Sequence, residues 1–447
     1  MLGLLNQWRR TFSHGLHPPE HKELTAKRPV VRLPFPEVLY VPLSQHTGAP
    51  AKPIVRPGQE VVRGEPIAEA DGFVSVPMHA PATGRVRSFE AVPSPRGRLV
   101  RAIAIDVYPS SDQAVLYGAP QDIDAMSPAE LILAVQESGV VGLGGAAFPT
   151  HVKLRVPEGK HIDTIIVNGC ECEPYLTTDH RLMLEQPGAV LKGLAIIRKA
   201  LGAERAIIGI EANKPDAVAA LRSVIRPEDG VEVCVVESKY PQGAEKMLIK
   251  SLLNREVPAG GLPVEVGAAV FNVATLAQIG ELLPIHQGLI ERIMTVTGEG
   301  IERPGNYLVP LGTPIRDVLR FTGLREGNPR VIFGGPMMGP TIASWDTPVT
   351  KGVSGILVLP QAVPENNGSA IPCIKCGACV NACPIHLNPC FLGQLARKRR
   401  YDAMDRQYHL LDCFECGCCT YVCPAEIPLV QQFRVAKQIV RERKAQA

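Results

Sequence analysis

The sequence predicts a multidomain α+β protein, and three observations support this fold class. The chain has 447 residues, which is too long for one hydrophobic core, so we expect three or four domains. Short segments punctuated by glycine and proline give way to alternating strands and helices, and the C-terminal part is rich in cysteine. We therefore divide the chain into an N-terminal segment and four domains, with the ranges 1–29, 30–125, 126–290, 291–360 and 361–447.

Composition and charge narrow the classes of function. Apolar residues make up 45% and charged residues 20% of the chain, which is ordinary for a globular protein. The net charge is only +3, without a basic stripe interleaved with aromatic residues, so we expect no nucleic-acid partner. Because no signal peptide and no apolar stretch of about 20 residues is visible, we expect a soluble or peripheral protein in a reducing compartment. Its 13 cysteines are then expected to bind metal rather than form disulfides.

Residues 1–12 have the pattern of a short amphipathic helix. Met1, Leu5, Trp8 and Phe12 fall at helical spacing, with two arginines beside them. Such a helix could lie on an anionic membrane surface or dock on the protein itself. The sequence leaves both interpretations open.

Residues 30–125 contain short strand-like stretches rich in proline and glycine. Four glycines separate these stretches, namely Gly58, Gly64, Gly72 and Gly84. The pattern resembles a barrel-sandwich domain of the lipoyl type. Lipoyl domains carry their cofactor on a lysine after an aspartate, whereas here Asp71 is followed by Gly72. We therefore expect a structural or docking domain that is not lipoylated.

Residues 126–290 alternate between strands and helices. The segment 127–130 predicts a helix start, because it combines a serine N-cap, a proline at the first position and a glutamate at the third. Buried strands are predicted at 164–167 and 206–210, with a helix at 189–201 between them. Repeated strand–helix units indicate an α/β sheet.

Residues 291–360 form a smaller predicted unit. A strand is expected at 293–298, a turn at 303–306 and a short helix at 314–321. This order indicates a small β-grasp domain of the SLBB type. Residues 360–370 are expected to be a linker, and the rest of the chain is expected to be helical.

Two identical cysteine runs dominate the C-terminal domain. Each has the spacing Cys-x2-Cys-x2-Cys-x3-Cys-Pro, which is typical of ferredoxins with two [4Fe–4S] clusters. Three thiolates on one loop hold three corners of a cubane, and the fourth cysteine of each run ligates the other cluster. We therefore assign cluster 1 to Cys373, Cys376, Cys379 and Cys423, and cluster 2 to Cys413, Cys416, Cys419 and Cys383.

Zinc is the alternative metal that so many thiols could bind. Structural zinc sites favour two separated cysteine pairs or mixtures of cysteine and histidine. Two identical four-cysteine runs, each ending in Cys-Pro, fit that pattern poorly. Cys390 and Cys418 fall outside the spacing and are not expected to be ligands, although Cys418 adjoins Cys419 and could replace it.

A glycine-rich loop from Gly142 to Thr150 lies between two helical patterns and is followed by Lys153. Glycines allow a backbone to approach a phosphate closely, and the amide groups and the lysine supply positive charge. The same residues could simply form a tight turn. Their spacing is not that of the Rossmann fingerprint.

The next predicted strand ends in the segment Val167–Pro174. Loops beyond the carboxyl ends of strands are where α/β folds bind ligands. Asn168 and Glu171 could therefore hydrogen-bond a ring edge or a ribose. Cys170 and Cys172 could bind a metal, but no partner ligand is nearby in the sequence, so we expect unligated thiols.

These motifs resemble a known family. Gly-x-Gly-Gly-x-x-Phe-Pro-Thr-x-x-Lys at 142–153, followed by Asn-x-x-Glu-x-Glu-Pro at 168–174, is similar to the NADH-oxidising flavoprotein subunit of respiratory complex I. Segments 240–245 and 271–276 resemble its later flavin and nucleotide loops. The two cysteine runs and the segment 15–24 match a nearer relative, because the chain is similar to the RnfC family of the Rnf (Rsx) ion-translocating electron-transport complexes.

The resemblance implies that the protein binds FMN non-covalently and exchanges hydride with NADH. FMN would be held by Gly142, Gly144, Lys153, Asn168, Glu171, Gly243 and Asn272. NADH would be contacted by Phe148, Glu173 and Glu245. Three positions depart from the complex I pattern and each loses a polar contact, namely Cys170, Ala244 and Phe271. No side chain is expected to act as a catalytic acid or base.

The resemblance further implies a translocase subunit that passes single electrons through two [4Fe–4S] clusters, between NADH and ferredoxin or flavodoxin. It would be peripheral, on the cytoplasmic face of the bacterial inner membrane. Its partners would be integral membrane subunits and an iron–sulfur electron-transfer subunit. The direction of electron flow and the coupling ion are left open.

Two other functions share part of this pattern. A soluble flavin and iron–sulfur cobalamin reductase shares the flavin loop and the cysteine runs, but it would lack the His-Pro-Pro-Glu segment at 17–20. An iron–sulfur scaffold that has lost its flavin would not need Gly142, Gly144, Lys153 and Asn168.

Overall fold

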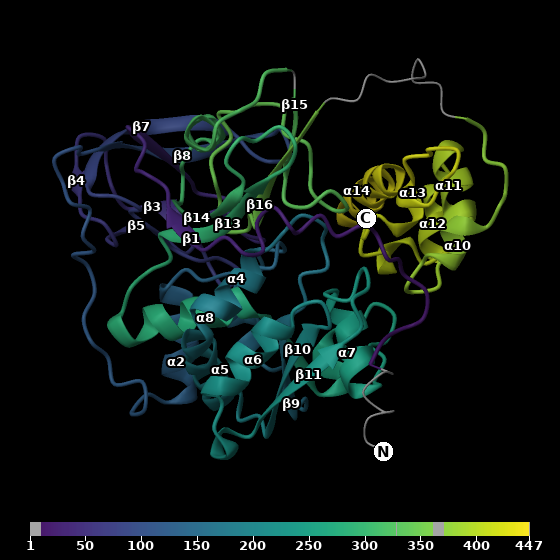
Figure 1. The fold of residues 1–447 in the computed structure, drawn as a ribbon, viewed down its shortest axis with the longest axis horizontal. Coiled ribbons are helices and arrows are strands. Elements are labelled where there is room, and N and C mark those ends of the chain that lie inside the picture. The colour runs from purple at the N-terminus through teal and green to yellow at the C-terminus, as the bar shows by residue number, and fades with distance from the viewer. Residues whose placement is uncertain (1–9, 328, 361–370, 447) are drawn as a thin grey trace.

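The computed structural model describes residues 10–327, 329–360 and 371–446. The predicted helix at residues 1–12 falls mainly, and the predicted linker at 360–370 almost entirely, outside these residues. Figure 1 shows the C-terminal helices as a group of their own, set apart from the short strands of the N-terminal half.

Two small antiparallel sheets form the first folded unit, with the strand orders β2-β8-β7-β4 and β3-β5-β6. Apolar side chains from both sheets, including Ile67, Met78 and Ile103, are completely buried in one core. The predicted barrel-sandwich domain is confirmed. Its strands are β2 (Val38–Pro42), β3 (Lys52–Pro53), β4 (Glu60–Val61), β5 (Pro66–Glu69), β6 (Met78–His79), β7 (Gly84–Pro93) and β8 (Leu99–Val107).

A parallel sheet with the order β11-β10-β9-β12 forms the second unit. Its strands are apolar on both faces because helices cover both faces. Ile165 and Val167 of β9 belong to the core shared with α5 and α8, whereas Ile166 packs with residues of α7. The strands are β9 (Thr164–Gly169), β10 (Arg205–Glu211), β11 (Val231–Val236) and β12 (Ala268–Asn272).

The helices of this unit begin where local signals predict. Ser127 and Glu130 form the expected capping box at the start of α2. The helix expected at 189–201 is α5, which starts two residues earlier at Pro187. The helices are α2 (Pro128–Glu137), α3 (Thr150–Leu154), α4 (Thr178–Glu185), α5 (Pro187–Leu201), α6 (Pro215–Val224), α7 (Glu245–Leu253) and α8 (Val273–Leu282), with 3-10 turns η2 (Pro227–Asp229), η3 (Pro263–Val266) and η4 (Leu283–Ile285).

A five-stranded mixed sheet, ordered β1-β14-β13-β16-β15, forms the third unit. Its edge strand β1 comes from the N-terminal part of the chain and pairs in parallel with β14. Residues 30–32 therefore lie in this sheet and not with the barrel-sandwich strands. The elements are β1 (Val30–Arg32), β13 (Glu291–Thr297), β14 (Gly305–Pro310), α9 (Ile315–Thr322), β15 (Pro329–Phe333) and β16 (Gly355–Pro360).

Short helices and two cysteine loops form the fourth unit, around a core that includes Leu392, Met404 and Phe433. The two loops lead into α10 and α13, which occupy equivalent positions in the two halves. The elements are α10 (Ala378–Asn381), α11 (Pro389–Arg397), α12 (Tyr401–Arg406), η5 (Leu410–Asp412), α13 (Cys418–Tyr421) and α14 (Leu429–Gln446).

The segment from residue 10 to residue 29 ties three of these units together. Leu16 exchanges backbone hydrogen bonds with Tyr240, both 2.8 Å long. The imidazole Nδ1 of His14 lies 3.2 Å from the carbonyl oxygen of Cys383 in the fourth unit. Asn306 of the third unit donates to the carbonyl of Thr25 at 3.0 Å. The segment thus holds the α/β unit against its neighbours.

Candidate functional site

Polar residues gather at the carboxyl edge of the parallel sheet. Asn168, Glu211 and Asn272 lie at the ends of β9, β10 and β12, respectively. In a parallel sheet these ends share one edge, which is where α/β folds bind ligands. The topology therefore brings together residues that lie far apart in the sequence.

The glycine-rich loop closes on itself above this edge. The amide of Gly142 donates to the carbonyl of Phe148 at 2.8 Å, and that of Ala147 donates back to Gly142 at 3.0 Å. The hydroxyl of Thr275 on α8 accepts from the amide of Leu143 at 2.9 Å. A side chain at Gly144 would meet that of Asn272 at 3.4 Å.

The tip of this loop offers free backbone donors. Gly144, Gly145 and Ala146 are exposed, and within the described ranges their amides donate to no protein acceptor. Gly145 has a φ of +106°, which only glycine adopts without strain. Exposed amides on a glycine loop fit a phosphate group. The loop is a tight turn, as the alternative interpretation predicts, and its exposed amides also fit a phosphate group.

Lys153 and Glu245 lie together, which the sequence did not indicate. Lys153 on α3 donates to the carboxylate of Glu245 at 2.7 Å and to the carbonyl of Val270 at 3.2 Å. Each side chain keeps about a third of its surface exposed (35% and 36%). The ion pair is therefore weak enough for the ammonium to be shared with an anionic ligand.

Asn168 and Gly243 are also in contact. The side-chain amide of Asn168 donates to the carbonyl of Gly243 at 2.9 Å, and its oxygen accepts from the amide of Cys170 at 3.0 Å. A Cβ at Gly243 would lie 2.6 Å from the carbonyl of Cys170, so only glycine allows this approach. The amide of Gly243 donates to the sulfur of Cys172 at 3.4 Å. Neither Cys170 nor Cys172 forms a disulfide.

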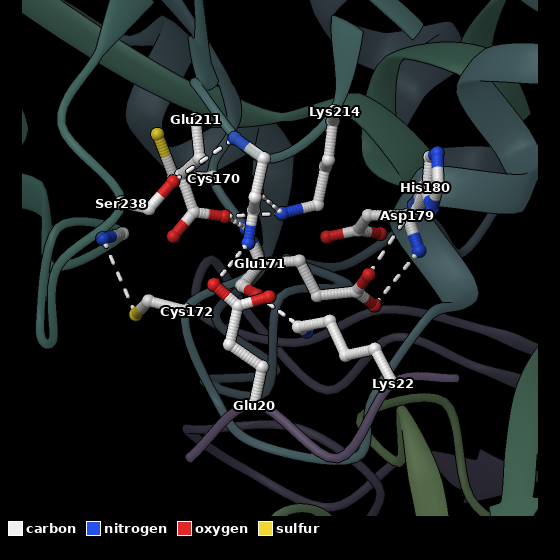
Figure 2. Close-up of polar contacts among 12 residues, drawn as sticks. Glu20, Lys22, Cys170, Glu171, Cys172, Asp179, His180, Glu211, Lys214 and Ser238 are labelled. Carbon is white, nitrogen blue, oxygen red and sulfur yellow. Dashed lines mark hydrogen bonds and ion pairs between the residues drawn. The ribbon is translucent and has the colours of Figure 1, made fainter. Parts of the chain in front are cut away.

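Glu171 is used differently from what the sequence indicated. Its carboxylate is buried and accepts from the amides of Asp179 and His180, at 2.9 and 3.3 Å, so it caps the start of α4 (Figure 2). Its own amide donates to Glu211 at 2.9 Å. In this structure Glu171 shapes the segment around it by binding backbone amides.

Asp179 is a site residue that the sequence did not single out. Its carboxylate accepts from the side-chain amide of Asn272 at 2.7 Å. Burial, followed by the charge of Glu171, raises the pKa of Asp179 to about 7. The side-chain oxygen of Asn272 also accepts from the amide of Ala274 and so caps the start of α8. An acidic residue in the first turn of a helix was the only sequence signal for Asp179.

Glu173 is bound to the third unit. Its two carboxylate oxygens accept from the amides of Met337 and Met338, at 3.0 and 2.9 Å. Burial raises the pKa of Glu173 to about 7. The NADH contact expected for Glu173 stays a prediction, since its oxygens are engaged with the backbone here.

Lys22 explains how the segment 171–176 keeps its shape. Its ammonium group is buried and donates to the carbonyl of Glu171 (Figure 2), and it also donates to the carbonyls of Glu173 and Leu176. Burial lowers the pKa of Lys22. A lone lysine in an extended segment has no periodic pattern, so only the tertiary structure could reveal this role.

The cysteines line two cavities in the fourth unit. The four thiols assigned to cluster 1 line the first cavity, namely Cys373, Cys376, Cys379 and Cys423. The four assigned to cluster 2 line the second, namely Cys383, Cys413, Cys416 and Cys419. Each run thus contributes its fourth cysteine to the cavity of the other run, as the spacing predicts.

This donor set fits two cubanes. Four thiols surround each cavity, which is the ligand number of a [4Fe–4S] cluster. Across the described residues, no three His, Cys, Asp or Glu side chains converge as ligands of a single metal ion. Burial raises the pKa of Cys379 and of Cys413 to about 11, and a positive partner such as iron would favour the thiolate forms that ligate it.

The two remaining cysteines of this unit also reach the cavity walls. Cys390 lines the first cavity, with its sulfur 3.9 Å from that of Cys373. Cys418 lines the second cavity and is completely buried. Cys419 packs in the core that includes Cys413, whereas Cys418 packs with Tyr240 and Ala382. Neither non-ligand assignment is tested by this packing, and both stay predictions.

The second cavity adjoins the loops at the sheet edge. The hydroxyl of Tyr240, three residues before Gly243, donates to the carbonyl of Cys416 at 2.6 Å. Tyr240 is 1% exposed and shares one apolar cluster with Cys172, Cys416 and Cys418. The sequence placed Tyr240 in a loop motif but assigned it no role.

Comparison with protein families assigns the four units. Residues 10–108 match the RnfC barrel sandwich hybrid domain, 135–281 the Nuo51 FMN-binding domain, 293–341 the SLBB domain and 369–437 the 4Fe-4S dicluster domain. A chain from the crystal structure of an NAD+-reducing [NiFe]-hydrogenase has a related fold. It aligns with a TM-score of 0.50 and 18% identity over 74% of this chain and 69% of that one.

Fold and site together define a flavin- and iron–sulfur-containing electron-transfer protein. The chain is 44% identical over 431 residues to the C subunit of the proton-translocating ferredoxin:NAD(+) oxidoreductase complex of Clostridium ljungdahlii, covering 96% of this chain and 93% of that one. It is 44% identical to the Na(+)-translocating counterpart of Acetobacterium woodii (97% and 98%), and 41% identical to the C subunit of the ion-translocating oxidoreductase complex of Pseudomonas aeruginosa (97% and 56%). The chain belongs to the RnfC family, and the cobalamin-reductase alternative is not favoured.

Membership of this family makes the chain a subunit of a membrane-associated, ion-translocating complex. No helix within the described residues is both long and apolar enough to cross a bilayer.

Proposed function

We propose that this chain is the part of a membrane-bound, ion-translocating ferredoxin:NAD+ oxidoreductase that exchanges electrons with NADH or NAD+. The names of its relatives and its FMN-binding and dicluster domains support this function. It is a peripheral subunit on the cytoplasmic face of the bacterial inner membrane. Its partners are integral membrane subunits and an iron–sulfur electron-transfer subunit.

One observation carries the proposal. The hydrogen bond from Tyr240 to Cys416 joins the loops of the sheet edge directly to the wall of the second cavity. A flavin site at that edge is then next to an iron–sulfur site, as electron transfer between them requires. The first cavity, in contrast, includes Cys376, which is exposed to solvent.

The residues at the sheet edge fit FMN. The exposed amides of Gly144 to Ala146 and the ammonium group of Lys153 suit its phosphate, and Asn168, Gly243 and Asn272 form the wall below. When bound, FMN interconverts two-electron hydride chemistry and one-electron transfer, and the clusters carry single electrons. The protein binds and orients the cofactor. Glu171 and Lys22 keep the adjoining segment in shape.

The NADH contacts are proposed at Phe148, Glu173 and Glu245. Phe148 is half-buried at the base of the glycine loop and is suited to stack on a planar ring. Glu245 meets the nucleotide next to Lys153, with which it is paired. The carboxylate of Glu173 accepts from the backbone amides of Met337 and Met338. The third unit therefore helps to shape the proposed NADH site.

The proposal is tested on protein reconstituted anaerobically with iron, sulfide and FMN. We expect about eight irons, from two four-iron clusters, and one FMN per chain, and we expect NADH to bleach the visible absorbance of the flavin. Lys153→Met should weaken FMN binding about 10- to 150-fold, since an ammonium–phosphate contact contributes roughly 1.5–3 kcal/mol. Lys160→Met, which alters an exposed lysine seven positions further along, is the matched control and should bind FMN normally.

Two results would contradict the proposed function. Protein that carries FMN but is not bleached by NADH without oxygen has no nucleotide site. Equal FMN affinity in Lys153→Met and Lys160→Met would remove Lys153 from the phosphate site. Co-purification of the chain with integral membrane subunits tests its place in the complex.

A further inference from the structure

The first cavity contains a fifth thiol, that of Cys390, besides the four assigned to cluster 1. Its sulfur lies 3.9 Å from the sulfur of Cys373. Cys390 lies in the first turn of α11, and Asn388 caps this helix by accepting from the amide of Phe391 at 3.1 Å. The side-chain amide of Gln394, one turn further along, donates to the sulfur of Cys390 at 3.5 Å. A capped helix and a hydrogen bond therefore hold this thiol at the cavity wall.

The distance between the two sulfurs is that of two ligands of one metal ion. In tetrahedral thiolate sites, metal–sulfur bonds of about 2.3 Å place neighbouring sulfurs about 3.8 Å apart. Cys373 and Cys390, at 3.9 Å, can therefore each reach the same iron. A cubane with four cysteine ligands uses one thiol for each iron. One of these two thiols is therefore surplus to the cluster.

The second half of the unit shows which thiol is surplus. The two runs align Cys413 with Cys373, and the same alignment places Val430 opposite Cys390. Val430 lines the second cavity as Cys390 lines the first. Because valine cannot bind iron, the second cavity has no ligand at this position. Cys390 is therefore an addition in the first half, beside a loop whose own cysteines already suffice for a cluster.

We propose that Cys390 is a reserve ligand of cluster 1, which can take the place of Cys373. The inference rests on the proposed function in one respect, because it takes the first cavity to hold a cluster. In the exchange, the bond between iron and the sulfur of Cys373 breaks, and a bond to the sulfur of Cys390 forms. The proton that Cys390 gives up passes to Cys373, and no electron is transferred.

The setting of the first cavity favours this role over that of a packing residue. A free cysteine often serves as a small apolar residue of a core. Val430 packs in this way in the second half, where it is 4% exposed, whereas Cys390 is partly exposed. The first cavity also includes the exposed Cys376, whose counterpart Cys416 is partly buried. Exposed thiols are the ones that oxidants modify, so a spare ligand has a use at this cavity.

The experiment measures iron in variants that are reconstituted anaerobically with iron, sulfide and FMN. Cys373→Ala removes the neighbouring ligand, and Cys373→Ala/Cys390→Val also replaces the reserve thiol with the residue of the second half. Cys413→Ala is the matched control, because the second cavity has Val430 in place of a reserve thiol. Cys418, the further cysteine of that cavity, packs in a different apolar cluster from Cys413.

We expect about eight irons, from two four-iron clusters, in the unmodified chain and in Cys373→Ala. Iron should fall by about half in Cys413→Ala and in Cys373→Ala/Cys390→Val. Cys390→Val alone should keep its iron, because the reserve thiol is not used while Cys373 is present. A second measurement maps free thiols with iodoacetamide and mass spectrometry. The reagent should modify Cys390 in the loaded unmodified chain and spare it in loaded Cys373→Ala.

Three outcomes would overturn the inference. They are equal iron in Cys373→Ala and Cys373→Ala/Cys390→Val, alkylation of Cys390 in loaded Cys373→Ala, and loss of half the iron in Cys390→Val, which would make Cys390 a resident ligand. Iron near zero in the unmodified chain would instead refute the cluster assignment itself, and the proposed function with it. If Cys373→Ala misfolds, Cys373→Ser and Cys373→Ser/Cys390→Val replace the pair and should differ in the same direction.

Discussion

The two cysteine loops of the C-terminal unit have the same backbone but different surroundings. The amide of Lys375 donates to the sulfur of Cys373, and that of Glu415 to the sulfur of Cys413, both at 3.4 Å. Lys375 and Glu415 have φ values of +58° and +64°, and the glycines two residues later have +77° and +86°. The repeated spacing therefore builds the same loop twice.

The surroundings give the two loops different roles. A Cβ at Gly417 would lie 2.6 Å from the carbonyl of Met337 in the third unit, whereas at Gly377 it would meet nothing within 4 Å. Glu415 is paired with Arg434 and Lys437, whereas its counterpart Lys375 is exposed and unpaired within the described residues. One loop is packed inwards against the flavin-site units, and the other faces solvent. Local spacing therefore builds the loop, while the neighbouring units decide whether it is packed inwards or faces solvent.

The largest expected effect breaks the symmetry between the two cavities. In Cys383→Ala the second cavity loses a ligand, and in Cys423→Ala the first cavity loses one. Iron should fall by about half in each variant. In Cys423→Ala the remaining cluster should still be reduced by NADH, because it adjoins the flavin site. In Cys383→Ala the remaining cluster should respond to dithionite but only slowly to NADH.

Electron paramagnetic resonance of samples reduced with NADH or with dithionite distinguishes these outcomes. Equal reduction by NADH in both variants would show that the order of the cavities is wrong. Loss of iron from the opposite cavity in either variant would show that the runs do not interleave.

A smaller effect is expected from Tyr240→Phe, which removes the hydrogen bond from the Tyr240 hydroxyl to Cys416 in the loop that lines the second cavity. The carbonyl of Cys416 would lose a buried partner, at a cost of about 1–3 kcal/mol. We expect NADH-dependent reduction of the second-cavity cluster to slow several-fold in stopped-flow absorbance, with the iron content kept. Tyr421→Phe, which alters an exposed tyrosine of the same unit, is the control. Matching rates in the two variants would mean that the hydroxyl does not position the loop.

The smallest expected effect concerns buried histidines outside both cavities. It should leave the difference between the two cysteine loops unchanged. Burial, and then the charge of Lys351, lowers the pKa of His46 to about 4 and of His79 to about 3. His151 also faces His46, and His286 faces His79. Below the ordinary pKa of 6.5, the unfolded chain takes up protons that the folded chain refuses. The contribution of these two histidines to the free energy of unfolding should therefore fall as the pH drops from about 6.5 towards about 4, whereas Asp179 and Glu173, whose pKa values are raised to about 7, contribute in the opposite direction.

Circular dichroism melting curves across this pH range give the measurement. As the pH drops, the melting temperature of the control His161→Gln, whose histidine is exposed, should fall by a few degrees relative to that of His79→Gln. A slope that is identical in both variants would exclude His79 as the titrating group. Selective loss of one cluster in mild acid would place the acid-sensitive group at a cavity instead.

Much of the fold followed from local sequence signals. The capping box at Ser127, the strands β9 and β10 and the helix α5 depend on interactions between near neighbours, and all were predicted. The pairing of β1 with β14 was not, because strand partners distant in sequence leave no local pattern. For the same reason, Lys153 and Glu245 were assigned separate roles although they form one ion pair.

The sequence predicted where the candidate site lies better than it predicted the contacts within the site. The glycine loop, Asn168, Gly243 and Asn272 do meet at the carboxyl edge of the sheet. Glu171 and Glu173 meet backbone amides instead, since buried carboxylates must find donors and the nearest ones here are on α4 and on the third unit. Asp179 and Lys22 entered the site only through burial next to these groups.

The sequence by itself determined the chemistry of this protein, because a cubane requires thiols at one spacing and a phosphate loop requires glycines. The spacing also predicts that the two runs exchange their fourth cysteines, which stays a prediction. Only the tertiary structure decided which cavity lies beside the flavin site and which opens to solvent. That choice depends on contacts such as that of Tyr240 with Cys416, which arise when distant segments pack together and which leave Cys376 of the first cavity exposed. Two identical motifs carry no information about their neighbours, so their difference appears only in the folded chain.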